Sequence, residues 1–179
     1  MLHRPGGGNL NNIIFTGYDL NNSKFWEVQF KDCDFSDVYL SGAALYGSVF
    51  ENCIFKKNTF RKGFCDYASF KDTTFDFLDS FRTSYNEAQF VNVQFKNSKM
   101  ERSYFDDSQF KNTEFINIEF SESSFNNCTF EGVKFKKCSF NKTSLKEIKG
   151  FDTAFFEDVA ILLDGQIISD LGNEIKFYL

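Results

Sequence analysis

Large apolar residues recur at every fifth position along most of this chain. Between Phe15 and Leu145 there are 27 such positions, here called centres, and 19 of them are Phe. The other centres are Leu20, Leu40, Leu45, Cys65, Ser80, Tyr85, Met100 and Leu145. The residue two before each centre is also selected, because 22 of these 27 small positions hold Ala, Cys, Ser, Thr, Val or Gly.

A period of five fits neither a straight helix nor a straight strand. Five residues rotate by about 140° around an α-helix, so the centres cannot share one helical face. Five is odd, so alternate centres would point to opposite faces of a strand. Two residues after each centre, 15 of 27 positions are Asn, Asp or Gly, which suit tight turns. The pattern therefore predicts short extended pieces that turn a corner in every repeat and wind into a β-solenoid.

Three stretches show the repeat most clearly: Val-Gln-Phe-Lys-Asp at 28–32, Val-Gln-Phe-Lys-Asn at 93–97 and Ser-Gln-Phe-Lys-Asn at 108–112. With these repeats the chain resembles the pentapeptide-repeat family, whose unit reads small, polar, Leu or Phe, and two variable residues. The resemblance implies an all-β fold, a right-handed quadrilateral β-helix with four repeats in each coil. The period alone also permits other polygons. On four sides, the 27 repeats make nearly seven coils.

Three segments are predicted. Residues 1–11, with three consecutive Gly and the single Pro, form a flexible N-terminal tail, and residues 12–152 form the β-helix. Residues 153–179 form a C-terminal cap, since a solenoid needs its apolar end covered. Residues 160–172 predict a short helix with Asp164 as N-cap and Gly172 as its stop, and residues 174–179 a terminal strand. Many members of the family end in a similar helix and strand.

The register is weakest at residues 76–85. Ser80 takes a centre there, while Phe77 and Phe81 lie off register. Either the coil is distorted or these two Phe side chains are exposed. Because the register resumes at Tyr85 with no insertion, we expect a mild distortion.

The five cysteines predict burial, not a disulfide framework. Four of them occupy small positions (Cys33, Cys53, Cys128 and Cys138) and Cys65 occupies a centre. Buried cysteine acts as a small apolar residue. Cys33 and Cys53 would be neighbours on a four-sided coil, but a reducing compartment disfavours a bridge. The chain has no apolar run of about 20 residues and no charged-then-apolar leader, so we expect a cytoplasmic location without a membrane span.

Candidate chemistry is sparse. The only His lies in the N-terminal tail, so His-based acid–base catalysis, nucleophile activation and metal ligation are not expected in the folded body. The cysteines lack C-x-x-C spacing, and Gly6–Gly8 follows no strand as a phosphate loop would. These patterns predict a non-enzymatic protein without cofactor or metal.

One side of the coil stands out by its charge. The side centred on Phe25, Leu45, Cys65, Tyr85 and Phe105 sums to −4, against +2, +1 and −1 for the other three. It also gathers outward aromatic residues, which beside carboxylates are typical of a binding surface. The alternative is that these rings only pack along neighbouring coils. The candidate partner-binding face comprises Trp26, Glu27, Tyr46, Phe64, Asp66, Tyr67, Glu87, Tyr104, Asp106 and Asp107.

The C-terminal segment carries more apolar residues than one cap surface needs. In the quinolone-resistance members of the family, this end forms a dimer interface. The resemblance therefore implies a homodimer. The candidate interface comprises Ile161, Leu162, Ile167, Ile168, Leu171, Phe177 and Leu179.

Two functions are open. The first is a scaffold that binds a protein partner through its faces and its C-terminal end. The second follows the quinolone-resistance members, which imitate duplex DNA and bind the type II topoisomerases DNA gyrase or topoisomerase IV; it requires dense negative charge. The repeats of this chain together carry only −2, so the scaffold is favoured. Neither hypothesis includes direct binding of nucleic acid.

Overall fold

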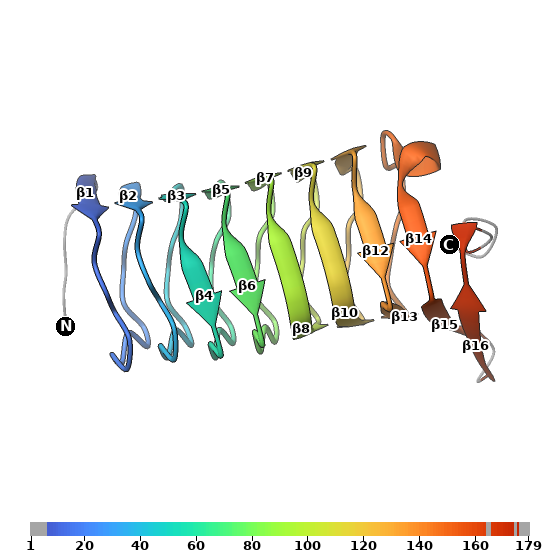
Figure 1. Ribbon diagram of the computed structural model, residues 1–179, viewed down its shortest axis with the longest axis horizontal. Helices are drawn as coiled ribbons and strands as arrows, with labels where there is room; N and C mark the ends of the chain where they lie inside the picture. The colour runs from blue at the N-terminus through green and yellow to red at the C-terminus, as the bar shows by residue number, and fades with distance from the viewer. Residues whose placement is uncertain (1–6, 164–165, 174, 176–179) are drawn as a thin grey trace.

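The computed structural model describes residues 7–163, 166–173 and 175. The chain winds into an elongated all-β solenoid of about eight turns, with coils stacked along the long axis (Figure 1). Paired residues on successive coils are 20 positions apart, as in Gly8 with Val28 and Phe75 with Phe95. Four five-residue repeats therefore complete one coil, which confirms the predicted right-handed quadrilateral β-helix.

Two sheets line the coil, and all their strand pairs are parallel except that of β15 with β16. The seven-stranded sheet comprises β1 (Gly8–Asn11), β2 (Val28–Lys31), β3 (Val49–Glu51), β5 (Ser69–Lys71), β7 (Gln89–Val91), β9 (Gln109–Lys111) and β11 (Thr129–Glu131). The other sheet comprises β4 (Ile54–Lys56), β6 (Thr74–Asp76), β8 (Gln94–Glu101), β10 (Glu114–Ser121), β12 (Lys134–Lys136), β13 (Ser139–Asn141), β14 (Phe155–Glu157), β15 (Val159–Leu163) and β16 (Gln166–Leu171). The remaining coil sides are held by single bridges, as in Ala44 with Phe64.

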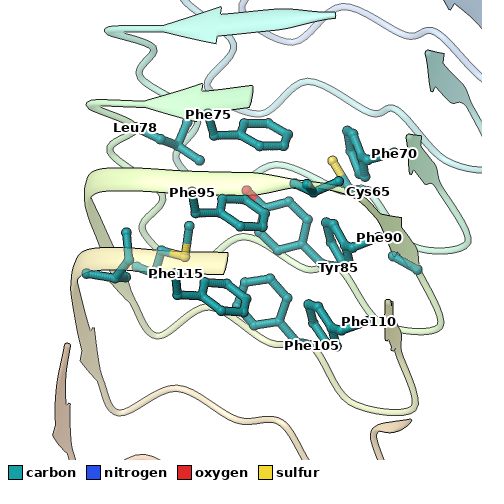
Figure 2. Packing of buried hydrophobic residues seen from close by; sticks show 14 of the residues in the cluster. Cys65, Phe70, Phe75, Leu78, Tyr85, Phe90, Phe95, Phe105, Phe110 and Phe115 are labelled. Carbon is teal, nitrogen blue, oxygen red and sulfur yellow. The ribbon is translucent and has the colours of Figure 1, made fainter. Parts of the chain in front are cut away.

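The centres fill the interior as stacked rings (Figure 2). Phe95 lies between Phe75 and Phe115, with ring centroids 4.6 and 5.0 Å away and planes within 9°. The ring of Phe90 on the adjoining side meets Phe95 at 5.6 Å and 61°. The stacking distance follows from the strand spacing of about 4.8 Å. One residue type therefore fills one repeated slot, as predicted.

The small positions do more than fit the width of the coil. Most of their hydroxyl and thiol groups donate to the carbonyl of the centre 23 residues earlier. Ser103 donates to the Ser80 carbonyl at 2.7 Å, and Cys128 donates to the Phe105 carbonyl at 3.0 Å. Ser, Thr and Cys thus supply a donor that Ala cannot, inside an otherwise apolar core.

All five cysteines are buried and free. This confirms their predicted role as small core residues. Burial raises the pKa of the Cys53, Cys128 and Cys138 thiols to about 12 in each case. Because the thiolate is the reactive species, these groups are unreactive at neutral pH in the folded protein.

Every position two residues after a centre turns the corner in the left-handed region. All 27 have positive φ, from 48° at Asn97 to 79° at Gly17. Twelve of them are neither Gly, Asn nor Asp, and they include Tyr67 and Phe77. This conformation costs such residues about 1–2 kcal/mol each. The stacking of the coils therefore dictates the corner, whatever residue occupies it.

The expected distortion at 76–85 is wrong. Asp76 pairs with Lys96 and Asp79 bridges Lys99, both at the regular offset of 20. Phe77 occupies a corner and is 54% exposed, because a corner side chain points away from the core. Phe81 is half-buried. An aromatic residue outside the centres is simply left on the surface.

The repeat extends further in both directions than predicted. At the N-terminal end, β1 pairs with β2, so the first coil begins before residue 12. At the C-terminal end, a short 3₁₀ turn (Phe151–Thr153) adds one residue to a coil, and Phe135 pairs with Phe156, 21 positions on. Gly150 allows this turn, because its φ is 79° and a Cβ there would lie 2.1 Å from the Phe130 carbonyl oxygen.

The helix predicted over 160–172 is wrong, because β15 and β16 form an antiparallel pair there. Val159 and Ile161 are both buried, which is the alternation of a strand. Asp-Gly at 164–165 between two apolar runs is a hairpin signal in the sequence, and these two residues lie outside the described ones. Of the predicted terminal strand at 174–179, only Ile175 is described, and it is buried.

Candidate functional site

The side of the coil singled out by its charge presents its aromatic residues to solvent. Trp26, Tyr46, Phe64, Tyr67 and Tyr104 are between 41% and 52% exposed. A hollow of about 490 Å³ opens between three successive coils, here called the aromatic hollow. It is lined by Trp26, Glu27, Ala44, Tyr46, Phe64 and Asp66.

The 20-residue register creates the aromatic hollow. Lys24, Ala44 and Phe64 occupy one column, and Ala44, the shortest of them, leaves room there. Lys24 Nζ lies 5.4 Å from the centre of the Trp26 ring, a cation–π contact. Ala44 and Lys24 are not among the predicted site residues. Their offsets of 20 and 40 residues from Phe64 would have identified them.

Tyr67 extends the aromatic surface beyond the hollow. Its ring centroid lies 5.1 Å from that of Tyr46. Its hydroxyl donates to Glu87 Oε1 at 2.6 Å, and this hydrogen bond, with the charge of Glu87, raises the pKa of Tyr67 to about 12. The phenol therefore keeps its proton at physiological pH and continues to donate.

Two of the predicted acidic residues have a structural role that the sequence pattern did not reveal. Asp66 Oδ1 accepts the backbone N–H of Asn86 at 3.0 Å, and Asn86 Oδ1 accepts that of Asp106 at 3.0 Å. Asp106 Oδ1 in turn accepts the N–H of Asn126 at 2.8 Å. These side chains form a ladder between coils. Each carboxylate has a second oxygen to offer a ligand.

The carboxylates of this face lack cationic partners within the described residues. Nine ion pairs occur there, and none includes Glu27, Asp66, Glu87, Asp106 or Asp107. On the other sides, ion pairs between coils neutralise several acidic residues. Lys134 Nζ, for example, lies 2.9 Å from Glu114 and lowers the pKa of that carboxyl.

The structure divides the predicted face into two groups. Ser84 lies between Phe64 and Tyr104 in their column, so Tyr104 is separated from the aromatic hollow. Asp106 and Asp107 lie on the same coil as Tyr104 and are likewise outside the hollow.

The predicted dimer residues have different surroundings. Ile161 is buried, Leu162 and Ile168 are half-buried, and Ile167 is 76% exposed. Ile161, Leu162 and Ile167 also border a groove of about 230 Å³ next to Phe140. The side chain of Leu171, and all of Phe177 and Leu179, lie outside the described residues.

In the described part of the chain, no group of three or more His, Cys, Asp or Glu side chains is placed to hold a metal ion. None of the helical segments in that part has the length and hydropathy of a membrane span.

Comparison with known proteins places the chain in a family. Eight copies of the model for pentapeptide repeats match residues 6–37, 33–63, 88–127 and 114–148. No curated protein matches the sequence. Among solved structures, a trypsin-treated variant of QnrB1, a plasmid-mediated fluoroquinolone resistance protein, is 15% identical with a TM-score of 0.67, covering 79% of this chain and 81% of that one. A second trypsin-treated QnrB1 variant is 13% identical with a TM-score of 0.51, covering 80% and 84%. The family models match more than half of the sequence, and the chain therefore belongs to the pentapeptide-repeat family.

Proposed function

We propose that this protein is a non-enzymatic scaffold that binds a protein partner through the aromatic hollow and the carboxylates beside it. The observation that carries the proposal is the combination of exposed rings around a hollow with carboxylates that no cation of the described residues neutralises. Aromatic anchors in a pocket are typical of binding hot spots. The excess of negative charge favours a partner with Lys or Arg side chains near an apolar anchor.

The proposal is tested by capture of partners from extracts of the native cell, comparing the wild-type protein with Tyr46→Ser. We expect one protein to be enriched by the wild type and to lose about tenfold in affinity with Tyr46→Ser, as truncated hot spots do. Tyr39→Ser is the matched control, because Tyr39 is 57% exposed on a different side of the coil. Equal capture by both variants would contradict the proposal.

A second candidate function is modulation of DNA gyrase or topoisomerase IV by DNA mimicry. It is supported by the likeness of fold to QnrB1, which is described as a fluoroquinolone resistance protein. The charge pattern weighs against it, because cross-coil ion pairs neutralise carboxylates on the other sides. Inhibition of gyrase supercoiling, or its rescue from a quinolone, would favour mimicry over the scaffold.

We further propose that the C-terminal end joins two copies of the chain. The support is that β16 is the last strand of its sheet among the described residues, with Ile167 76% exposed on it. An uncovered edge strand is a template for pairing. Light scattering should give the mass of a dimer for the wild type and of a monomer for Ile167→Lys. A monomeric wild type at high concentration would refute this.

A further inference from the structure

A second hollow, of about 550 Å³, lies at a corner of the coil apart from the aromatic hollow. It is lined by Asn21, Asn22, Ser41, Gly42, Arg61, Lys62 and Phe81. We call it the basic hollow. Its residues follow the centres of four successive coils by one or two positions. At Gly42 the corner carries no side chain, and a Cβ there would lie 2.4 Å from Asn22 Oδ1, the end of a side chain that can rotate away.

The lining of the basic hollow is chemically one-sided. It contains two cations, Arg61 and Lys62, and no carboxylate. Asn21 Oδ1 already accepts the Ser41 backbone N–H at 2.7 Å, which leaves the Asn21 amide NH₂ to donate. The Ser41 hydroxyl adds a further donor. The hollow therefore offers positive charge and hydrogen-bond donors, which are the groups that bind an oxyanion.

Stacking on Phe81 organises the guanidinium groups beside the hollow. The Cζ atoms of Arg61 and Arg82 lie 4.8 and 5.2 Å from the Phe81 ring centre, and that of Arg102 lies 5.9 Å away. A guanidinium held on a ring face keeps the N–H groups at its edge for another acceptor. The half-buried Phe81 side chain thus acts as a support for cations from three coils.

These cations differ in how far they are neutralised. Arg102 Nε donates to Glu122 at 2.7 Å. Arg61 Nη1 lies 3.7 Å from Asp79, which is longer than a hydrogen bond. Lys62 and Arg82 take part in none of the nine ion pairs of the described residues. Net positive charge therefore remains at the hollow.

We propose that the basic hollow binds a phosphate group, with Arg61 and Lys62 holding its oxygens and the Asn21 amide and Ser41 hydroxyl completing the site. A guanidinium fork matches two phosphate oxygens, while an ammonium serves as a point charge. The net charge of −5 and the neighbouring acidic side oppose a long polyanion. The site thus fits one phosphate group on a small molecule or a phosphorylated peptide. It does not depend on the aromatic hollow.

Calorimetric titration of the full chain with pyrophosphate at low salt tests the site. We expect saturable binding that weakens at least about tenfold in the double variant Arg61→Gln/Lys62→Gln, because both charged contacts are lost. Lys56→Gln/Lys57→Gln is the matched control. Lys56 and Lys57 follow Phe55 as Arg61 and Lys62 follow Phe60, Lys57 and Lys62 share φ of 56°, and all four side chains are exposed. The control should bind like the wild type.

A third variant tests the hollow without altering its cations. Gly42→Asp should keep the fold, because Asp32 and Asp37 already occupy corners of the same conformation and the exposed Asn22 side chain can rotate away from the new Cβ. It should abolish binding by placing a carboxylate in the hollow. No saturable binding by the wild type, or equal weakening in the Lys56/Lys57 control, would overturn the proposal. A phosphoserine peptide binding much more tightly than pyrophosphate would identify a phosphorylated segment as the source, and the reverse a small molecule.

Discussion

Replacing Phe95 with alanine is expected to lower the free energy of unfolding by about 3–5 kcal/mol. The Phe95 ring is fully buried and stacks on Phe75 at 4.6 Å and on Phe115 at 5.0 Å. The alanine variant loses both contacts. A coil locked between two neighbours cannot collapse into the cavity, so little of the loss is recovered. Urea unfolding followed by circular dichroism measures the change.

The solenoid supplies its own control for Phe95→Ala. Phe77→Ala removes the same ring from a corner where it is 54% exposed, and should change stability by less than about 0.5 kcal/mol. Phe95→Leu is the conservative variant, since Leu fills the centres at Leu20 and Leu40. It should cost under about 1.5 kcal/mol. Similar losses for Phe95→Ala and Phe77→Ala would show that the ring columns do not hold the coils together.

Ser80 and Tyr85 are expected to behave as one unit. Ser80 is a small residue in a column of large ones, and the hydroxyl of Tyr85 lies 3.1 Å from its Oγ. Ser80→Met alone should cost about 1–3 kcal/mol, because the longer side chain meets the Tyr85 hydroxyl in a filled core. Tyr85→Phe alone should cost about 1 kcal/mol through the lost hydrogen bond.

The double variant Ser80→Met/Tyr85→Phe reproduces the next coil, which carries Met100 and Phe105 at the equivalent centres. It should be more stable than Ser80→Met alone, with a favourable coupling of about 1 kcal/mol or more in the thermodynamic cycle. Thermal and urea unfolding of the four proteins give the cycle. If the two losses of unfolding free energy were strictly additive, Ser80 and Tyr85 would not be coupled, and the contact between their hydroxyl groups would have no energetic effect.

The sequence predicts what is repeated and misses what occurs once. The five-residue spacing predicts the solenoid, the core columns and the corners, because each rule recurs over 27 repeats and is met in most of them. The single inserted residue at Phe151–Thr153 leaves no periodic trace. The antiparallel pair of β15 and β16 is not distinguished from a helix by its sequence, because a short apolar run is compatible with both structures. Asp-Gly at 164–165 was the signal that favoured strands.

The surface was predicted less completely, because contacts between columns depend on side-chain lengths. The alternation of inward and outward positions is enough to predict that Trp26, Tyr46 and Phe64 face the solvent. It does not show that Ala44 opens a hollow between them, or that Asp66 accepts a hydrogen bond from the backbone N–H of Asn86. Phe81 lies off register in the sequence, and only the structure shows that its ring supports three arginines.

The uniform backbone of the corners affects how the sequences of such proteins diverge. Because backbone shape at all 27 corners is independent of the residue there, outward side chains can be exchanged without insertions or altered loops. Selection on folding then acts chiefly on the inward residues, about two in every five. Two chains can therefore retain one architecture while their exteriors become unrelated. This chain and the QnrB1 variant share their fold, with a TM-score of 0.67, at only 15% identity.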